Sequence, residues 1–125
     1  MSLYLIRRNK VITMTRGDYL SIDIELKSGK FPNEKIYQIN EGDIVFFGLM
    51  EPNQPFEKAI LKKEFGYDDF AMEGQSLIKI VLNPEDTIEL APGTYYYQVK
   101  VLYRDESGVT HIDTAVQKTK FIIVD

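Results

Sequence analysis

The chain contains no cysteine and no tryptophan, and it has a single histidine. Without cysteine it can form neither disulfides nor thiolate metal sites. Apolar runs are also short: none approaches the ~20 residues of a membrane-spanning helix, and the run at 3–6 is too short for a signal-peptide core. We therefore expect no membrane insertion and no signal peptide, with synthesis in the cytoplasm.

Charge of one sign is not in strong excess. Lys and Arg number 15 and Asp and Glu number 19, which gives a net charge of −4, and the two signs are interspersed along the sequence. This balance disfavours nonspecific binding to nucleic acid or to anionic membranes. With 44% hydrophobic and 27% charged residues, the 125-residue chain has the composition of a folded protein and the length of one domain, so we expect a single domain over 1–125.

The clearest pattern lies in the segment 95–104, where residue types alternate with a period of two. One face of this segment carries Tyr95, Tyr97, Val99, Val101 and Tyr103. Such alternation, rich in aromatic and β-branched residues, predicts a long β-strand whose odd-numbered side chains point into the core. Before it, the sequence NPEDT at 83–87 predicts a short helical turn at 84–88, with Asn83 as its N-cap.

Other strands are predicted at 18–27, 43–50, 58–65 and 77–82, and the runs 3–7 and 10–15 are predicted as one edge strand broken in the middle. Inward positions are expected at the even residues 20–26, at the odd residues 45–49, and at the even residues 78–82. About seven short strands without a long helix indicate an all-β fold, namely an immunoglobulin-like antiparallel β-sandwich. A small closed barrel is the alternative.

The sequence DESG at 105–108 predicts a four-residue hairpin loop. This loop places Val101 opposite Ile112, Val99 opposite Thr114, Tyr97 opposite Val116, and Lys100 opposite Asp113, a favourable cross-strand charge pair. His111 and Lys100 then face outward, and Ile112 faces inward. Farther along, the inward parity changes to odd at Phe121 and Ile123. A single extra residue in 117–120 would reconcile the two parities, so a β-bulge is predicted there.

No constellation of catalytic residues is apparent. His111 lacks the partners of a nucleophilic triad, and Asp23 and Glu25 lie at strand spacing on an open face. Asp68, Asp69 and Glu73 lack the spacing of a calcium loop, so we interpret them as solvated acids. The tripeptide Arg16-Gly17-Asp18 is interpreted as a tight turn, and the lysines at 58, 62 and 63 as protection of a sheet edge. We predict no enzyme, no metal site and no cofactor; a small β-fold enzyme would require a pocket with convergent titratable groups.

Outward apolar residues are the more informative feature. If 43–50 and the 95–104 strand are neighbours, their outer faces present Ile44, Phe46, Tyr96 and Leu102. We predict this apolar patch as an interface, in an oligomer or with another protein. One alternative is that the long connection 28–42 covers it. Another is that exposed aromatic residues form a groove that binds carbohydrate or a cell surface.

Four segments together resemble a known family: TMTRGDYLSIDIEL (13–26), EGDIVFFGL (41–49), NPEDTIELAPGTYYYQVKV (83–101) and KFIIV (120–124). They are similar to the immunoglobulin-like β-sandwich modules of phage and prophage tails and baseplates in Gram-positive bacteria, including the N-terminal domain of upper-baseplate proteins. The resemblance spans 11–125. It implies a non-enzymatic structural module of the virion that contacts other phage structural proteins or further copies of itself.

Overall fold

The computed structural model describes residues 3–5, 10–28, 35–37, 39–70 and 77–125. In chain order the elements are β1 (Leu3–Leu5), β2 (Ile12–Thr15), β3 (Leu20–Ser28), β4 (Lys35–Ile36), β5 (Ile44–Met50), η1 (Phe56–Lys58), β6 (Leu61–Gly66), η2 (Tyr67–Phe70), β7 (Leu77–Leu82), α1 (Pro84–Thr87), β8 (Gly93–Arg104) and β9 (Thr110–Val124). Nine of these twelve described elements are strands, where about seven were predicted. The turn α1 is the predicted helical turn, whereas the short turns η1 and η2 were not predicted. In the part of the chain that is described, no helix is long and apolar enough to cross a membrane.

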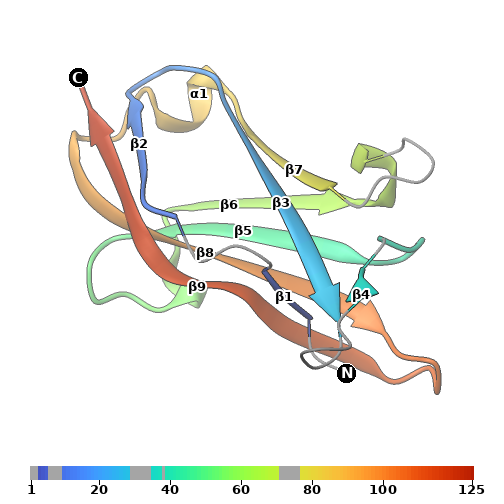
Figure 1. Ribbon diagram of the computed structural model, residues 1–125. Coiled ribbons are helices and arrows are strands. Elements are labelled where there is room, and N and C mark those ends of the chain that lie inside the picture. The colour runs from blue at the N-terminus through green and yellow to red at the C-terminus, as the bar shows by residue number, and fades with distance from the viewer. Residues whose placement is uncertain (1–2, 6–9, 29–34, 38, 71–76) are drawn as a thin grey trace.

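The strands form two sheets that pack face to face (Figure 1). One has four strands, β1, β3 and β4 with β7 beside β3, and the other has five in the order β2-β9-β8-β5-β6. The strands β9, β8, β5 and β6 face the strands β1, β3 and β7. This is the strand order of an immunoglobulin-like sandwich in which the three-stranded sheet β9-β8-β5 carries one added strand, β6. Tyr95, near the start of β8, donates its hydroxyl to the carbonyl of Ala91 at 2.5 Å. This is the tyrosine corner of that fold, so the prediction of a β-sandwich is confirmed.

The core lies between the sheets and consists of the inward positions that alternation predicts. The odd positions of β8 from Tyr95 to Tyr103 are at most 8% exposed, and Val45, Phe47 and Leu49 of β5 are fully buried. From the opposite sheet Leu26, Ile80 and Leu82 are fully buried as well, and Leu20 and Ile22 pack against this cluster. The side chains of Ile24 and Ile78 lie outside the described part. Burying a large apolar side chain stabilises the fold by roughly 1.5–3 kcal/mol.

The first two strands differ from the prediction of one broken edge strand. β1 pairs with β3 in the four-stranded sheet, whereas β2 pairs with β9 in the five-stranded sheet. The chain therefore crosses from one sheet to the other between them. As a result, β2 runs parallel to β9, from Ile12 opposite Phe121 to Thr15 opposite Val124. All other strand pairs are antiparallel, as predicted.

The predicted register of the β8–β9 hairpin is wrong by one residue. Leu102 lies opposite Ile112 and Val101 opposite Asp113, because the loop has one more residue than predicted and ends at Val109. The N–H of Asp105 donates to the carbonyl of Val109 at 2.9 Å, and the Asp105 carboxylate accepts the N–H groups of Ser107 and Val109, each at 2.9 Å. These bonds hold a five-residue loop in place of the four-residue loop that the sequence suggested.

Two irregularities then change the parity of β9. Val99 faces Val116 and Lys100 faces Thr114, so Ala115 is an extra residue; Tyr97 faces Thr119, so a second extra residue lies at 117–118. The second lies within the predicted segment 117–120, and the first was not predicted. Because of the first shift, the consecutive residues Ala115 and Val116 are both buried. Bulges bend the strand that carries them, and β9 curves strongly in Figure 1.

The turn α1 is connected to the edges of both sheets by one charged pair. The carboxylate of Asp86 accepts the backbone N–H of Asn83 at 2.7 Å and also the ammonium of Lys63 at 2.7 Å. Lys63 lies on the edge strand β6 and donates as well to the carbonyl of Val81 on β7, at 3.0 Å. The predicted lysine-rich edge is therefore present, but Lys63 points inward and links β6, β7 and α1.

Candidate interface and neighbouring polar cluster

The four residues predicted as an interface lie on the outer face of the five-stranded sheet, and each is partly buried. Ile44 and Leu102 are direct cross-strand partners, and Phe46 follows Ile44 two positions along the same face of β5. Tyr96 lies six residues from Leu102 along β8, which corresponds to ~20 Å, and its partner on β5 is Met50. The structure therefore brings three of the four residues together and places Tyr96 at the other end of the face.

Ile112 completes this group, and sequence reasoning missed it. It lies opposite Leu102 on β9 and is 60% exposed, the second-highest exposure among the large apolar residues that the structure describes. Ile44, Leu102 and Ile112 therefore form a row across β5, β8 and β9, which we call the outer apolar row. The one-residue register error had placed Ile112 in the core. The signal in the sequence that could have revealed Ile112 is Asp105, whose carboxylate accepts backbone N–H groups and so favours a longer hairpin loop.

The middle of the outer face is covered by η1. The ring of Phe56 lies over Gly48, where an added Cβ would be 2.5 Å from the Cε2 atom of that ring. The ammonium of Lys100 lies 4.8 Å from the centroid of the same ring, a cation–π contact. In the connection 28–42, residues 29–34 and 38 lie outside the described part, and β4 belongs to the other sheet. The ring of Phe56 thus separates Tyr96 from the outer apolar row.

The outer face of the five-stranded sheet is predominantly cationic. Strand alternation places the charged residues Lys62, Glu64, Lys100, Arg104 and Lys120 on it. All except Lys100 are exposed. The predicted pair between Lys100 and Asp113 does not form, because Asp113 faces inward beside Tyr103.

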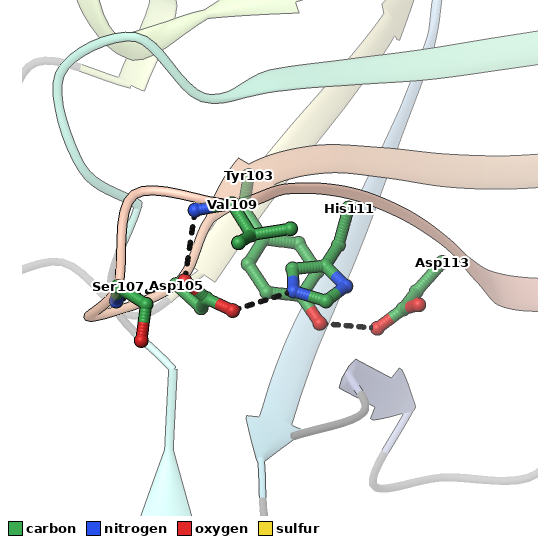
Figure 2. A network of polar contacts seen from close by, with 6 residues as sticks. All are labelled: Tyr103, Asp105, Ser107, Val109, His111 and Asp113. Atoms are coloured by element: carbon green, nitrogen blue, oxygen red, sulfur yellow. Dashed lines mark hydrogen bonds and ion pairs between the residues drawn. The ribbon is translucent and has the colours of Figure 1, made fainter.

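A polar cluster lies on the inner face of the β8–β9 hairpin, next to the hairpin loop (Figure 2). Tyr103 is 1% exposed and donates its hydroxyl to the carboxylate of Asp113 at 2.7 Å. The His111 ring stacks on the Tyr103 ring, with centroids 5.3 Å apart and planes 19° apart. Its Nε2 atom lies 2.8 Å from the carboxylate of Asp105. The prediction that His111 faces outward is therefore wrong: the register places it on the inner face opposite Tyr103, where its side chain is 35% exposed.

The cluster continues across the sandwich through a second tyrosine. Tyr37 packs edge-on against Tyr103, with centroids 6.0 Å apart, and donates its hydroxyl to Asp43. The same carboxylate accepts the backbone N–H of Asn40 at 2.9 Å. Asp43 is 5% exposed, so these bonds satisfy a carboxylate that would otherwise be costly to bury. The two tyrosines thereby join the start of β5 to the end of β8.

Electrostatics in the cluster favour structural roles. Burial, followed by the hydrogen bonds to their carboxylate partners, raises the pKa of both Tyr37 and Tyr103, so both remain hydroxyl donors at neutral pH. The contact with His111, together with the N–H groups of Val109 and Ser107, lowers the pKa of Asp105. His111 and Asp105 are therefore engaged in holding the hairpin loop. Asp23, another candidate acid, lies apart from them on β3, exposed and opposite Lys79.

Three other residues considered as functional candidates from the sequence, Arg16, Asp18 and Asp69, have structural partners. The N–H of Asp18 donates to the carbonyl of Thr15 at 3.1 Å, with Gly17 between them at φ +81°, so the tripeptide 16–18 forms the predicted tight turn. The Arg16 guanidinium pairs with Asp125 at 2.8 Å. Asp69 accepts the N–H of Gly66 at 2.7 Å, and Glu73 lies outside the described part. Within the described residues, no three His, Asp or Glu side chains are grouped so that they could hold a metal ion.

Comparison with known proteins adds no relative to this picture. No protein-family model matches the chain, and a search of curated proteins finds no match. The outer apolar row and the polar cluster therefore rest on the geometry alone.

Proposed function

We propose that this chain is a non-enzymatic structural module of a phage or prophage tail or baseplate, which acts in the virion through protein–protein contacts. The observation that carries the proposal is the outer apolar row of Ile44, Leu102 and Ile112. An apolar row across three neighbouring strands exposes surface that contact with another protein would bury. The segments that resemble phage baseplate modules support the same assignment.

The polar cluster is consistent with a structural module. Its carboxylates each accept donors that hold a turn or a strand end, and its tyrosines stay protonated at neutral pH. A rigid hairpin positions Ile112 on β9 opposite Leu102, so the cluster maintains the geometry of the outer apolar row. Binding of carbohydrate is the weaker alternative, because the aromatic residues predicted on the outer face, Phe46 and Tyr96, are each partly buried and lie apart on that face.

The proposal is tested on particles induced from a bacterium that carries the gene. The wild-type chain should co-purify with tail particles at a fixed stoichiometry on immunoblots. Replacing Ile112 with Asp should remove it from the particles, because a charge on the outer apolar row would be desolvated in the contact. Ile36→Asp is the matched control, since Ile36 is also an exposed isoleucine, at 51%, but belongs to the other sheet. A wild-type chain that is absent from purified particles would refute the proposal.

A further inference from the structure

Charge distinguishes the possible partners of the outer apolar row. The strands place the cations Lys62, Lys100, Arg104 and Lys120 and the carboxylate Glu64 on the outer face of the five-stranded sheet, although the chain as a whole has a net charge of −4. The turn η1, which covers the middle of this face, adds one charge of each sign, Glu57 and Lys58. The charges of the molecule are therefore segregated: this face is positive and the remainder is negative. An interface forms most readily between surfaces of opposite potential.

A symmetric dimer through this face would bring the cations of one copy against those of the other. In an isologous contact the same patch meets itself, so the cations would face an equal number of cations and fewer carboxylates from the partner. Like charges brought together at an interface disfavour the wrong partner. The predicted interface is thus unsuited to two identical faces.

We propose that the outer face docks a heterologous protein surface that carries an apolar patch flanked by carboxylates. The outer apolar row fits the apolar patch. Arg104 lies two positions from Leu102 on β8, whereas Lys62 lies opposite Gly48 and Lys120 opposite Tyr96, farther along the face, so these cations meet carboxylates beside the patch. The ammonium of Lys100 lies against the Phe56 ring, so Lys100 stabilises the face itself rather than contacting the partner. This inference rests on the proposed assembly function and specifies the partner of that same surface.

A charge-reversed copy of the chain provides a partner of this chemistry. The variant Lys62→Glu/Arg104→Glu/Lys120→Glu keeps Ile44, Leu102 and Ile112 and replaces the three exposed cations of the outer strands with carboxylates. Sedimentation velocity is measured for wild type alone, for the variant alone and for their equimolar mixture. We expect the mixture to associate at least ~10-fold more tightly than either protein with itself, and to dissociate in 0.5 M NaCl, since salt screens exposed charges.

The matched control reverses the same number of charges elsewhere. Lys10, Lys35 and Lys79 are exposed and lie outside the five-stranded sheet's outer face, so Lys10→Glu/Lys35→Glu/Lys79→Glu should not associate with wild type. Circular dichroism confirms that each variant is folded before it is mixed. Ile112→Asp in either partner should abolish association of the mixture.

Each other outcome overturns the inference in a distinguishable way. Wild type that associates with itself as tightly as the mixture does makes a second copy the occupant; the assembly function then survives and the acidic partner does not. A mixture that stays monomeric means that the face does not dock an acidic surface, and the proposed function then loses its main observation. Equal association with the control triple variant means nonspecific charge attraction. Co-sedimentation of wild type with phosphatidylserine vesicles at comparable affinity would make a membrane surface the partner.

Discussion

The ion pair between Lys63 and Asp86 connects the edge strands of the two sheets, and its contribution to the free energy of unfolding can be predicted. Lys63 donates to Asp86 at 2.7 Å and to the carbonyl of Val81 at 3.0 Å, so it joins β6 to β7 and α1. The two charged side chains are only 19% and 16% exposed. Replacing Lys63 with Met keeps the length of the stem, removes the ammonium, and leaves a largely buried carboxylate with one fewer donor.

The magnitude follows from the burial of the pair. Hydrogen bonds to charged groups contribute roughly 1.5–3 kcal/mol, and breaking a fully buried ion pair costs roughly 3–5 kcal/mol. Because this pair retains some exposure, we expect Lys63→Met to lower the free energy of unfolding by roughly 2–3 kcal/mol. For a domain of this size that corresponds to a Tm lower by roughly 6–15 °C.

Urea unfolding followed by circular dichroism measures the loss, since the chain has no tryptophan to report by fluorescence. Lys62→Met is the matched control. Lys62 is the neighbouring residue on β6, is exposed, and donates only to the carbonyl of Glu57, at 2.9 Å, so its replacement should cost ~0.5 kcal/mol or less. In a double-mutant cycle with Asp86→Asn, the two charges should show a coupling energy of ~1 kcal/mol or more. Equal losses for Lys62→Met and Lys63→Met would refute the reasoning.

Three further predictions concern β8 and its hairpin. Tyr97→Ala should lower the free energy of unfolding by roughly 3–5 kcal/mol, because Tyr97 is 4% exposed and donates its hydroxyl to the carbonyl of Lys10 at 2.6 Å. Tyr96→Ala should lower it by only about 1 kcal/mol. Equal losses for the two variants in thermal unfolding would contradict the assigned faces. The lowered pKa of Asp105 lies below its unfolded value of 3.8, so its stabilisation is present above about pH 4 and is lost as the pH falls through the lowered folded value. The protection of the Ser107 and Val109 amides against hydrogen exchange, relative to the intrinsic rate at each pH, should fall there in wild type, and Asp105→Asn should show low protection at every pH. The pKa of Tyr103 is raised above 10.0, so the stabilisation by its protonated hydroxyl is complete below that pH and is lost as the pH rises toward the folded value. In urea unfolding between pH 9 and 11, the stability of Tyr103→Phe should therefore fall less steeply than that of wild type. Parallel curves would exclude this contribution of the Tyr103 hydroxyl.

Comparison of the predicted and observed strands separates local from nonlocal information. Where a strand buries one face, its inward residues follow from alternation alone, and this holds for β8. In β5 alternation identifies Val45, Phe47 and Leu49, but Met50 on the outer face is fully buried as well. The turn α1 was equally predictable, because Asn83, Pro84 and Asp86 lie within one helical turn and their bonds are local. The presence of an apolar outer face was predicted from β5 and β8, and Ile44, Phe46 and Leu102 lie together on it.

The sequence by itself therefore determined the all-β class, the α1 turn and the inward residues of the strands, since each depends on neighbours within a few positions. Tertiary structure decided which residues of β9 meet β8. That register depends on the Asp105 carboxylate, which lengthens the hairpin loop, and on extra residues at Ala115 and at 117–118, whose cost is offset only by packing against the opposite sheet. It moved His111 inward onto Tyr103 and Ile112 outward beside Leu102, because a shift of one residue exchanges the two faces of a strand.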